Sequence, residues 1–251
     1  LSLIVYIVVM GVPNIRLSMF AWKYTTENCS MLPSILNTLM MTVLTLVIAV
    51  PIGAFSAIYL VEYAKKGNKF VGVVRVTAET LSGIPSIVYG LFGMLFFVTK
   101  LKWSYSMLAG AFTLAIMILP LIMRTTEEAL ISVPDSYREG SFGLGAGKLR
   151  TVFQVVLPSA IPGILAGVIL GIGRIVGETA ALMYTSGTVA KYAGAMESGR
   201  TLALHMYVLT SEALHVDQAS ATAVVLLIIV IGINAFSGFI AKKLAKKTGE
   251  E

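Results

Sequence analysis

The segment REGSFGLGAGKLRTVFQVVLP, residues 138–158, is basic and rich in glycine, and it lies between two long apolar stretches. It resembles two nucleotide-binding motifs only in part. A P-loop needs glycine where Phe142 stands and Ser or Thr where Leu149 stands. A dinucleotide fingerprint needs a third glycine where Lys148 stands. The spacing therefore excludes both motifs, and the segment needs another explanation.

The same segment has the pattern of two short helices joined by a turn. We expect the first helix to begin near Pro134, because proline suits the first turn of a helix. Three glycines then interrupt it: Gly143, Gly145 and Gly147. From Leu149 onward apolar residues recur at helical intervals, and we expect Pro158 to end that run. Such a pair of helices outside the membrane favours a surface that binds a partner.

The composition places the rest of the chain in a membrane. Of the 251 residues 57% are hydrophobic and 13% are charged, against about 25% charged in soluble domains. A helix of about 20 apolar residues crosses a bilayer. Stretches of that kind occur at Ile35–Val61, Thr80–Thr99, Ser104–Met123, Ser159–Thr185 and Ser220–Ala241. With Leu1–Val12 taken as the truncated end of a first span, we expect an all-α polytopic bundle of about six transmembrane helices.

The distribution of charge predicts the orientation of this bundle. Twelve of the 19 Lys and Arg residues would lie on one side of the membrane and six on the other. Because the positive side is usually cytoplasmic, residues 124–158 and the C-terminus are expected there, and residues 186–219 outside. We expect residues 1–251 to form a single domain. We attribute its net charge of +6 to membrane topology and anionic lipid, and not to nucleic-acid binding. The single Cys29 and the two histidines make no disulfide or metal pattern.

Prolines and small polar residues disturb two of the expected spans. Pro51 lies in the second span, and the start of the third contains Ser82, Gly83, Pro85 and Ser86. Each proline removes a backbone donor, so a neighbour or a cavity must satisfy the freed carbonyl. The polar groups available for that are Asn37, Thr38, Thr42, Thr45, Ser82 and Ser86. These breaks are either simple helix kinks or hinges that line a transport pathway.

One expected span contains charge, in the sequence GRIVGET. Arg174 and Glu178 are four residues apart, so on one helix they would share a face and neutralise one another. Charges at bilayer depth usually face the bundle interior or a water cavity. Two interpretations remain open: a structural bridge, or a guanidinium that contacts an oxyanion. A proton relay through Glu178 is less favoured, because the adjacent arginine stabilises its ionised form.

The long loop after this span contains one further helical pattern. Five residues have near-helical spacing: Leu202, His205, Met206, Leu209 and Leu214. They predict an outer-side helix that lies against the bundle. We interpret His205 and His215 as ordinary interfacial histidines, because no catalytic or ligand set accompanies them.

The spacing within residues 139–158 resembles the cytoplasmic loop signature of ABC-importer permeases. In that signature E-A-A is followed by three residues, a glycine, nine residues and I-x-L-P. Glu139, Gly145, Val155, Leu157 and Pro158 match it. Gly140 and Ser141 replace the two alanines, and valine replaces isoleucine. The segments LSGIPSIVYGLFG, RTTEEALISVPDSYREG and GRIVGETAALMYTSG extend the resemblance across the chain, toward phosphate-specific permeases of the PstA type rather than the PstC type.

This resemblance implies a type I ABC-importer permease with cytoplasmic coupling helices at Glu139, Gly140, Ser141, Gly145, Val155, Leu157 and Pro158. The family pairs such a chain with a second, PstC-type permease, two ATP-binding subunits and an outer phosphate-binding protein. The chain would be no enzyme and hold no cofactor, because the partner subunits bind ATP. The implied location is a bacterial or archaeal plasma membrane, and the implied phosphate pathway includes Arg174, Glu178 and Thr179.

Of three rival functions, two remain at this level. The nearest is an ABC permease for another oxyanion, such as sulfate, molybdate or phosphonate. An ion-coupled secondary transporter or channel would use Arg174 and Glu178 without ATPase partners. An intramembrane enzyme has no support, because the sequence contains no Ser/His pair, carboxylate dyad or metal set.

Overall fold

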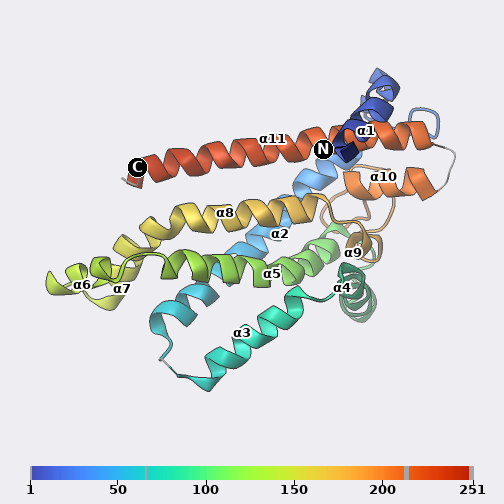
Figure 1. Ribbon diagram of the computed structural model, residues 1–251. Coiled ribbons are helices and arrows are strands. Elements are labelled where there is room, and N and C mark those ends of the chain that lie inside the picture. The colour runs from blue at the N-terminus through green and yellow to red at the C-terminus, as the bar shows by residue number, and fades with distance from the viewer. Residues whose placement is uncertain (1, 66, 212–214, 249–251) are drawn as a thin grey trace. The chain divides into compact units, whose positions relative to one another are not determined.

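The structure is a computed structural model that describes residues 2–65, 67–211 and 215–248 (Figure 1). Over these residues the chain forms helices and connecting loops, and no β-strand occurs among them. The expected all-α class is therefore confirmed. Leu214, which was expected to continue the outer-side helix, lies outside the described residues.

Four apolar helices of the described chain are long enough to cross a membrane. They are α2 (Leu32–Ile58, continued by the π-helical turn η3, Tyr59–Tyr63), α5 (Met107–Ile131), α8 (Leu157–Val176) and α11 (Val216–Thr248). A fifth span results if α3 (Lys69–Ser82) and α4 (Ser86–Gly93, extended by η4, Met94–Lys100) count as one broken helix. The helix α1 (Ser2–Gly11) lies where the first span was expected, and it is shorter than the helices that are long enough to cross a membrane.

The prediction that Thr80–Thr99 forms one continuous helix was wrong. The helix breaks between Ser82 and Ser86, because Pro85 has no N–H and disfavours helical geometry at the residue before it. Its first part begins earlier than expected, at Lys69, where the Asn68 side chain accepts a 3.0 Å hydrogen bond from the Phe70 N–H. Pro51, by contrast, lies inside α2 without ending it.

Two further boundaries differ from the expectation. The fourth span was expected to reach Thr185, but α8 ends at Val176 and a short helix, α9 (Ala180–Met183), follows a break. Pro158 was expected to end a helix, yet α7 (Lys148–Thr151), the π-helical turn η5 (Val152–Val156) and α8 run on without interruption. Pro158 lies in the first turn of α8, and the Ser159 hydroxyl donates to the Val155 carbonyl at 2.9 Å.

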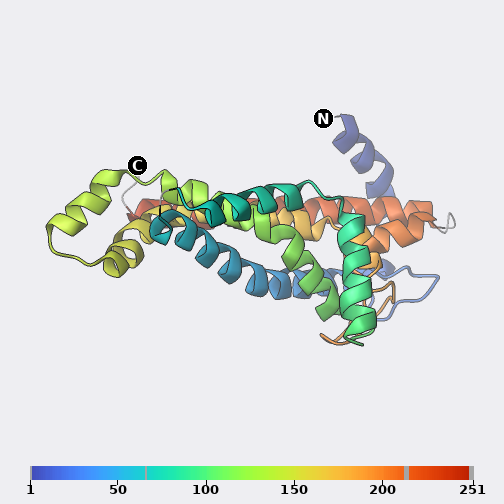
Figure 2. The same cartoon turned by 90° about the horizontal axis from the view of Figure 1, so that it is seen from below.

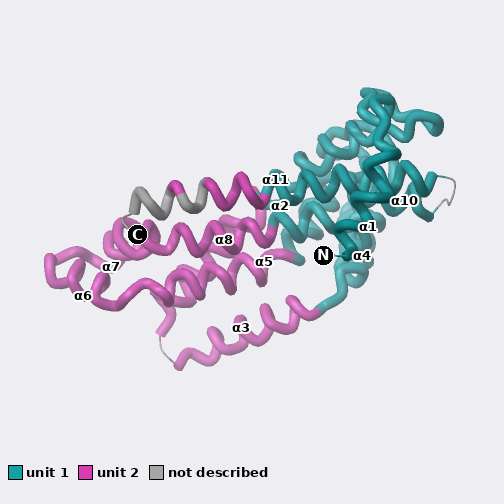
Figure 3. Tube along the Cα trace, turned by 45° about the horizontal axis from the view of Figure 1, so that its top comes forward, with its two compact units in different colours: residues 1–46, 84–117, 172–233 teal, residues 47–83, 118–171, 234–251 magenta. Residues whose placement is uncertain are grey.

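The chain divides into two compact units, which Figure 3 colours separately. Unit 1 comprises residues 1–46, 84–117 and 172–233, and unit 2 comprises residues 47–83, 118–171 and 234–251. The helices α2, α5, α8 and α11 contribute residues to both. Each unit has its own buried core, so each can be described separately.

In unit 1 the loop that precedes Leu202 is attached to α2 by buried side chains. Asn37 donates to the carbonyls of Lys191 (2.8 Å) and Arg200 (3.1 Å) and accepts from the Ala193 N–H (3.1 Å). The Thr38 hydroxyl accepts from the Leu202 N–H at 2.8 Å. The sequence offered these two residues among the groups that could satisfy carbonyls freed by proline. They instead bind backbone groups between Lys191 and Leu202.

Unit 2 packs around the end of α2 and the beginning of α8. Its core consists of Ala57, Ile58, Leu60, Met123, Ala129, Leu130, Val133, Val152, Val156 and Ala160. The inner face of α3 adds Val71, Val74 and Ala78 to this core. Two of these core residues, Val152 and Val156, belong to η5, so the helix after the glycine-rich turn is packed into the core near its beginning.

Candidate functional site: a coupling segment and a charged helix end

The glycine-rich segment in unit 2, residues 138–158, which we call the coupling segment, folds with its flanking residues as a helix, a turn and a second helix (Figures 1 and 2). The first helix, α6 (Asp135–Gly143), starts directly after Pro134, as the sequence predicted. Gly145 then adopts a φ of +83°, in the left-handed region that favours glycine. Ser141 and Thr151 join the two helices through a 2.8 Å hydroxyl contact.

Arg138 fixes the base of α6 to two other elements. Its Nη2 donates to Glu62 Oε1 at 2.7 Å and to the Leu130 carbonyl at 2.9 Å. Its Nη1 donates to the Val133 carbonyl at 2.8 Å, so the guanidinium satisfies carbonyls at and just beyond the C-terminal end of α5. The Arg138 and Glu62 side chains are only 15% and 8% exposed. We call this ion pair the Arg138–Glu62 joint.

The turn of the segment and the residues beside it have exposed apolar side chains. Leu144, next to the turn, is 92% exposed, and Leu149 is 66% exposed. Tyr137, Phe142 and Phe153 are also exposed. Exposed apolar patches rimmed by polar residues mark interaction sites. The exposed apolar side chains of residues 137–153 form what we call the coupling face.

The predicted coupling residues divide into an exposed and a partly buried set. Glu139, Gly140 and Gly145 are exposed, and a side chain added at Gly140 or Gly145 would meet no atom within 4 Å. Ser141 is partly buried through its contact with Thr151. Val155, Leu157 and Pro158 are partly buried, and Leu157 packs against the core of unit 2. The exposed residues are accessible to a partner, whereas the partly buried residues attach the coupling segment to the rest of unit 2.

In unit 1 the charged sequence does not form the expected helical pair. Because α8 ends at Val176, Arg174 and Glu178 do not lie on one helix, and no ion pair joins them in the described chain. Glu178, 9% exposed, instead accepts the Ala181 N–H at 3.0 Å and caps α9. Arg174 is exposed at the last turn of α8, and Thr179 is half-buried. The expectation of mutual neutralisation was wrong.

The residues of the expected hinge occupy the break between α3 and α4. Gly83 follows α3, Pro85 precedes α4, and Ser82 donates to the Glu79 carbonyl of its own helix at 2.7 Å. Ser86 is the first residue of α4. The break is therefore real, and whether it moves during transport stays a prediction.

Close contact between α4 and α9 was not foreseen. A side chain at Gly90 would place its Cβ 2.8 Å from the Ala181 Cα, so only glycine allows this approach. The pattern YGLFG contained the signal, because glycines three apart can permit close helix packing. Gly90 thus positions the short helix whose first turn Glu178 caps.

The helix predicted in the loop after the charged span is present as α10 (Leu202–Ser211), but His205 is not an interfacial residue. It is fully buried, and Arg200, 3% exposed, lies over the Tyr24 ring at 4.7 Å. Burial, together with the nearby Arg200 charge, lowers the pKa of His205 to about 3, although a contact with the Cys29 backbone opposes the shift. His205 is therefore neutral at physiological pH.

Comparison with known proteins identifies the family. A family model described as the inner membrane component of binding-protein-dependent transport systems matches residues 49–250. The probable ABC transporter permease protein YqgI of Bacillus subtilis is 32% identical over 96% of this chain and 88% of its own length. The phosphate transport system permease protein PstA of Pasteurella multocida is 40% identical over 72% of this chain and 64% of its own length. PstA 1 of Mycobacterium tuberculosis H37Rv is 40% identical over 60% of this chain and 48% of its own length.

Solved structures share the fold. A bacterial alginate ABC transporter, in complex with an alginate-pentasaccharide-bound periplasmic protein, matches with a TM-score of 0.72 at 15% identity, over 98% of this chain and 89% of the other. An inward-facing MetNI methionine ABC transporter matches with a TM-score of 0.65 at 20% identity, over 96% and 97%. At such identities the likeness supports the fold alone. From the family match and its relatives, the chain belongs to the inner membrane components of binding-protein-dependent transport systems.

Proposed function

We propose that this chain is the PstA-type permease subunit of an ATP-driven phosphate importer. It would form half of the pathway beside a PstC-type permease, receive phosphate from an outer binding protein and dock two ATP-binding subunits. The residues matched by the family model include the whole coupling segment. The names of the P. multocida and M. tuberculosis relatives support phosphate as the substrate. The protein would be a multi-pass plasma (inner) membrane protein with a cytoplasmic C-terminus.

The observation that carries this proposal is the coupling face. Within unit 2 its most exposed side chain, Leu144, is 92% exposed, while the Arg138–Glu62 joint holds α6, the helix that ends just before Leu144, to η3 and α5. A base held by buried hydrogen bonds, with an exposed apolar tip, suits a segment that receives force from a partner subunit. ATP binding by the docked subunits would move the segment and reverse the side on which the pathway opens.

Arg174 is the residue that we assign to phosphate in the pathway. Its guanidinium is exposed and has no carboxylate partner in the described chain, so its donors are available to an oxyanion. Glu178 would act differently, by holding α9 in place through its cap. Thr179, next to Glu178, would line the pathway.

ATP-dependent phosphate uptake by the complete complex in proteoliposomes tests the proposal. Wild-type complex should import phosphate, and excess sulfate, molybdate or phosphonate should compete poorly. Arg174→Gln should abolish uptake while the complex still assembles. Preferential uptake of another oxyanion would reassign the substrate, and uptake without ATPase subunits would favour an ion-coupled transporter instead.

A further inference from the structure

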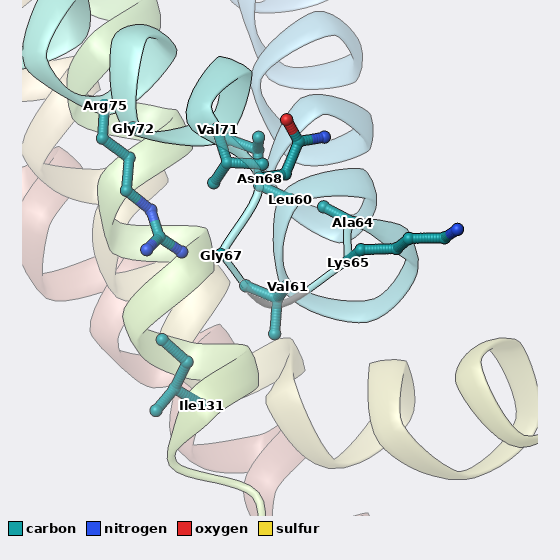
Figure 4. A pocket seen from close by; sticks show the side chains of 10 residues that line it. All are labelled: Leu60, Val61, Ala64, Lys65, Gly67, Asn68, Val71, Gly72, Arg75 and Ile131. Atoms are coloured by element: carbon teal, nitrogen blue, oxygen red, sulfur yellow. The ribbon is translucent and has the colours of Figure 1, made fainter.

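A pocket of about 450 Å³ lies in unit 2 where two candidate spans end (Figure 4). Its walls come from η3, the loop that follows, the first half of α3 and the last residue of α5, Ile131. The volume falls in the range of about 300–1,000 Å³ typical of ligand sites. Because Tyr63 and Ile131 end candidate membrane spans, the pocket would lie near the boundary between hydrocarbon and water.

The lining combines apolar walls with positive charge. Leu60, Val61, Ala64, Val71 and Ile131 supply apolar surface, and the ten lining residues include two cations and no carboxylate. The cations are Lys65 and Arg75. Such a lining suits a ligand that carries a negative group on an apolar body.

Arg75 is held in place by a carboxylate outside the lining. Its Nε lies 3.2 Å from Glu127 Oε2, while its side chain remains 49% exposed. In the described chain no acceptor engages its two terminal nitrogens. Figure 4 shows the guanidinium reaching past Gly67 toward Ile131, whereas the Lys65 amine extends outward on the other side. The flexible lysine stem allows its charge to turn over the opening.

The outer face of α3 continues the apolar surface away from the pocket. Phe70, Val73 and Val76 are 63%, 62% and 63% exposed. They lie on an exposed face of α3 that adjoins the face through which Val71 and Val74 pack into the core of unit 2. Acyl chains in the bilayer can cover this face, and a headgroup attached to such a chain would reach Lys65 and Arg75.

We propose that this pocket binds the phosphate headgroup of an anionic phospholipid, with an acyl chain along α3. Basic pockets beside transmembrane helices favour anionic headgroups, with a roughly fivefold effect for each basic residue. The inference is independent of the transported substrate, because it concerns a different unit from Arg174.

The test measures lipid retained by the purified complex in native mass spectrometry, with phosphatidylglycerol or phosphatidylcholine added. Phosphatidylglycerol should be retained preferentially, and Lys65→Gln should lower its retention about fivefold. Gly72→Leu should lower it further by filling the pocket, because a Cβ at Gly72 meets nothing within 4 Å and the helix accepts leucine.

Two control variants separate this pocket from general effects. Lys69→Gln removes an exposed charge that does not line the pocket, and Gly232→Leu adds the same side chain at an open glycine of α11. Neither should change retention. Equal retention in Gly72→Leu and Gly232→Leu, or equal retention of both lipids, would overturn the proposal. Displacement by inorganic phosphate would assign the pocket to free phosphate and would also overturn it.

Discussion

Replacement of Glu62 by glutamine tests whether the Arg138–Glu62 joint holds the coupling segment in place. The change keeps the shape of the side chain and removes its charge. Arg138 would then keep its contacts with the Leu130 and Val133 carbonyls but lose its buried counter-charge. The helix α6 should open more often, because its base is less firmly attached.

The size of the effect follows from the burial of the pair. Loss of one partner from a buried ion pair typically costs about 3–5 kcal/mol. The 15% exposure of the Arg138 side chain and the remaining acceptors favour the lower end, about 3 kcal/mol. With a factor of ten for each 1.4 kcal/mol, the amides of α6 should exchange with deuterium about a hundredfold faster.

The Arg124–Glu128 pair provides the matched control. It has similar geometry, at 3.1 Å, but its side chains are 67% and 66% exposed. Glu128→Gln should therefore cost less than about 0.5 kcal/mol. Hydrogen–deuterium exchange of the purified protein compares the two variants directly. Equal and small changes at α6 in both would refute the idea that the joint anchors this helix.

Three further predictions concern unit 1. The pKa of His205 is about 3 in the folded state, below the unfolded value of 6.5, so the protein binds a proton on unfolding below pH 6.5. The free energy of unfolding should therefore keep the His205 contribution above pH 6.5 and be about 2 kcal/mol lower at pH 5. Denaturant titration at both pH values checks this, and His205→Gln should flatten the dependence. Asn37→Ala should cost about 3 kcal/mol by leaving buried loop groups unpaired, and limited proteolysis should then cut residues 187–199 faster; unchanged cutting would contradict this. Gly90→Val should lower thermal stability by about 1–3 kcal/mol through overpacking against Ala181, whereas Gly232→Val, at an open site, should not.

The helices were predictable where hydrophobicity alone decides them. The spans around α2, α5 and α11 follow from long uncharged runs, and the start of α6 follows from Pro134. The end of α8 at Val176 was missed because glycine alone does not signal a helix end. Gly163 and Gly167 lie inside the same helix without interrupting it. Pro158 misled in the opposite direction: it lies inside a continuous helix, where the π-helical turn η5 and the Ser159 hydroxyl, which donates to the Val155 carbonyl, accommodate the missing donor.

The side-chain partners were less predictable than the helices. Arg138 and Glu62 are 76 positions apart, and Asn37 contacts backbone groups more than 150 positions away. No local pattern contains such distances. The spacing of residues 139–158 located the coupling segment, but the exposure of Leu144 depends on how the turn at Gly145 orients it.

The central claim is that the coupling face receives force from ATP-binding subunits. Gly145→Trp is a poor probe of it, because a side chain at a positive φ is strained wherever space exists. Leu144→Asp changes only an exposed side chain, and Leu17→Asp, at a residue 93% exposed in unit 1, is its control.

The decisive measurement is ATP-dependent phosphate uptake, with ATPase subunits counted in each purified complex. Leu144→Asp should reduce both uptake and the bound ATPase subunits, while Leu17→Asp should retain both. Full uptake with normal ATPase binding in Leu144→Asp would contradict the account.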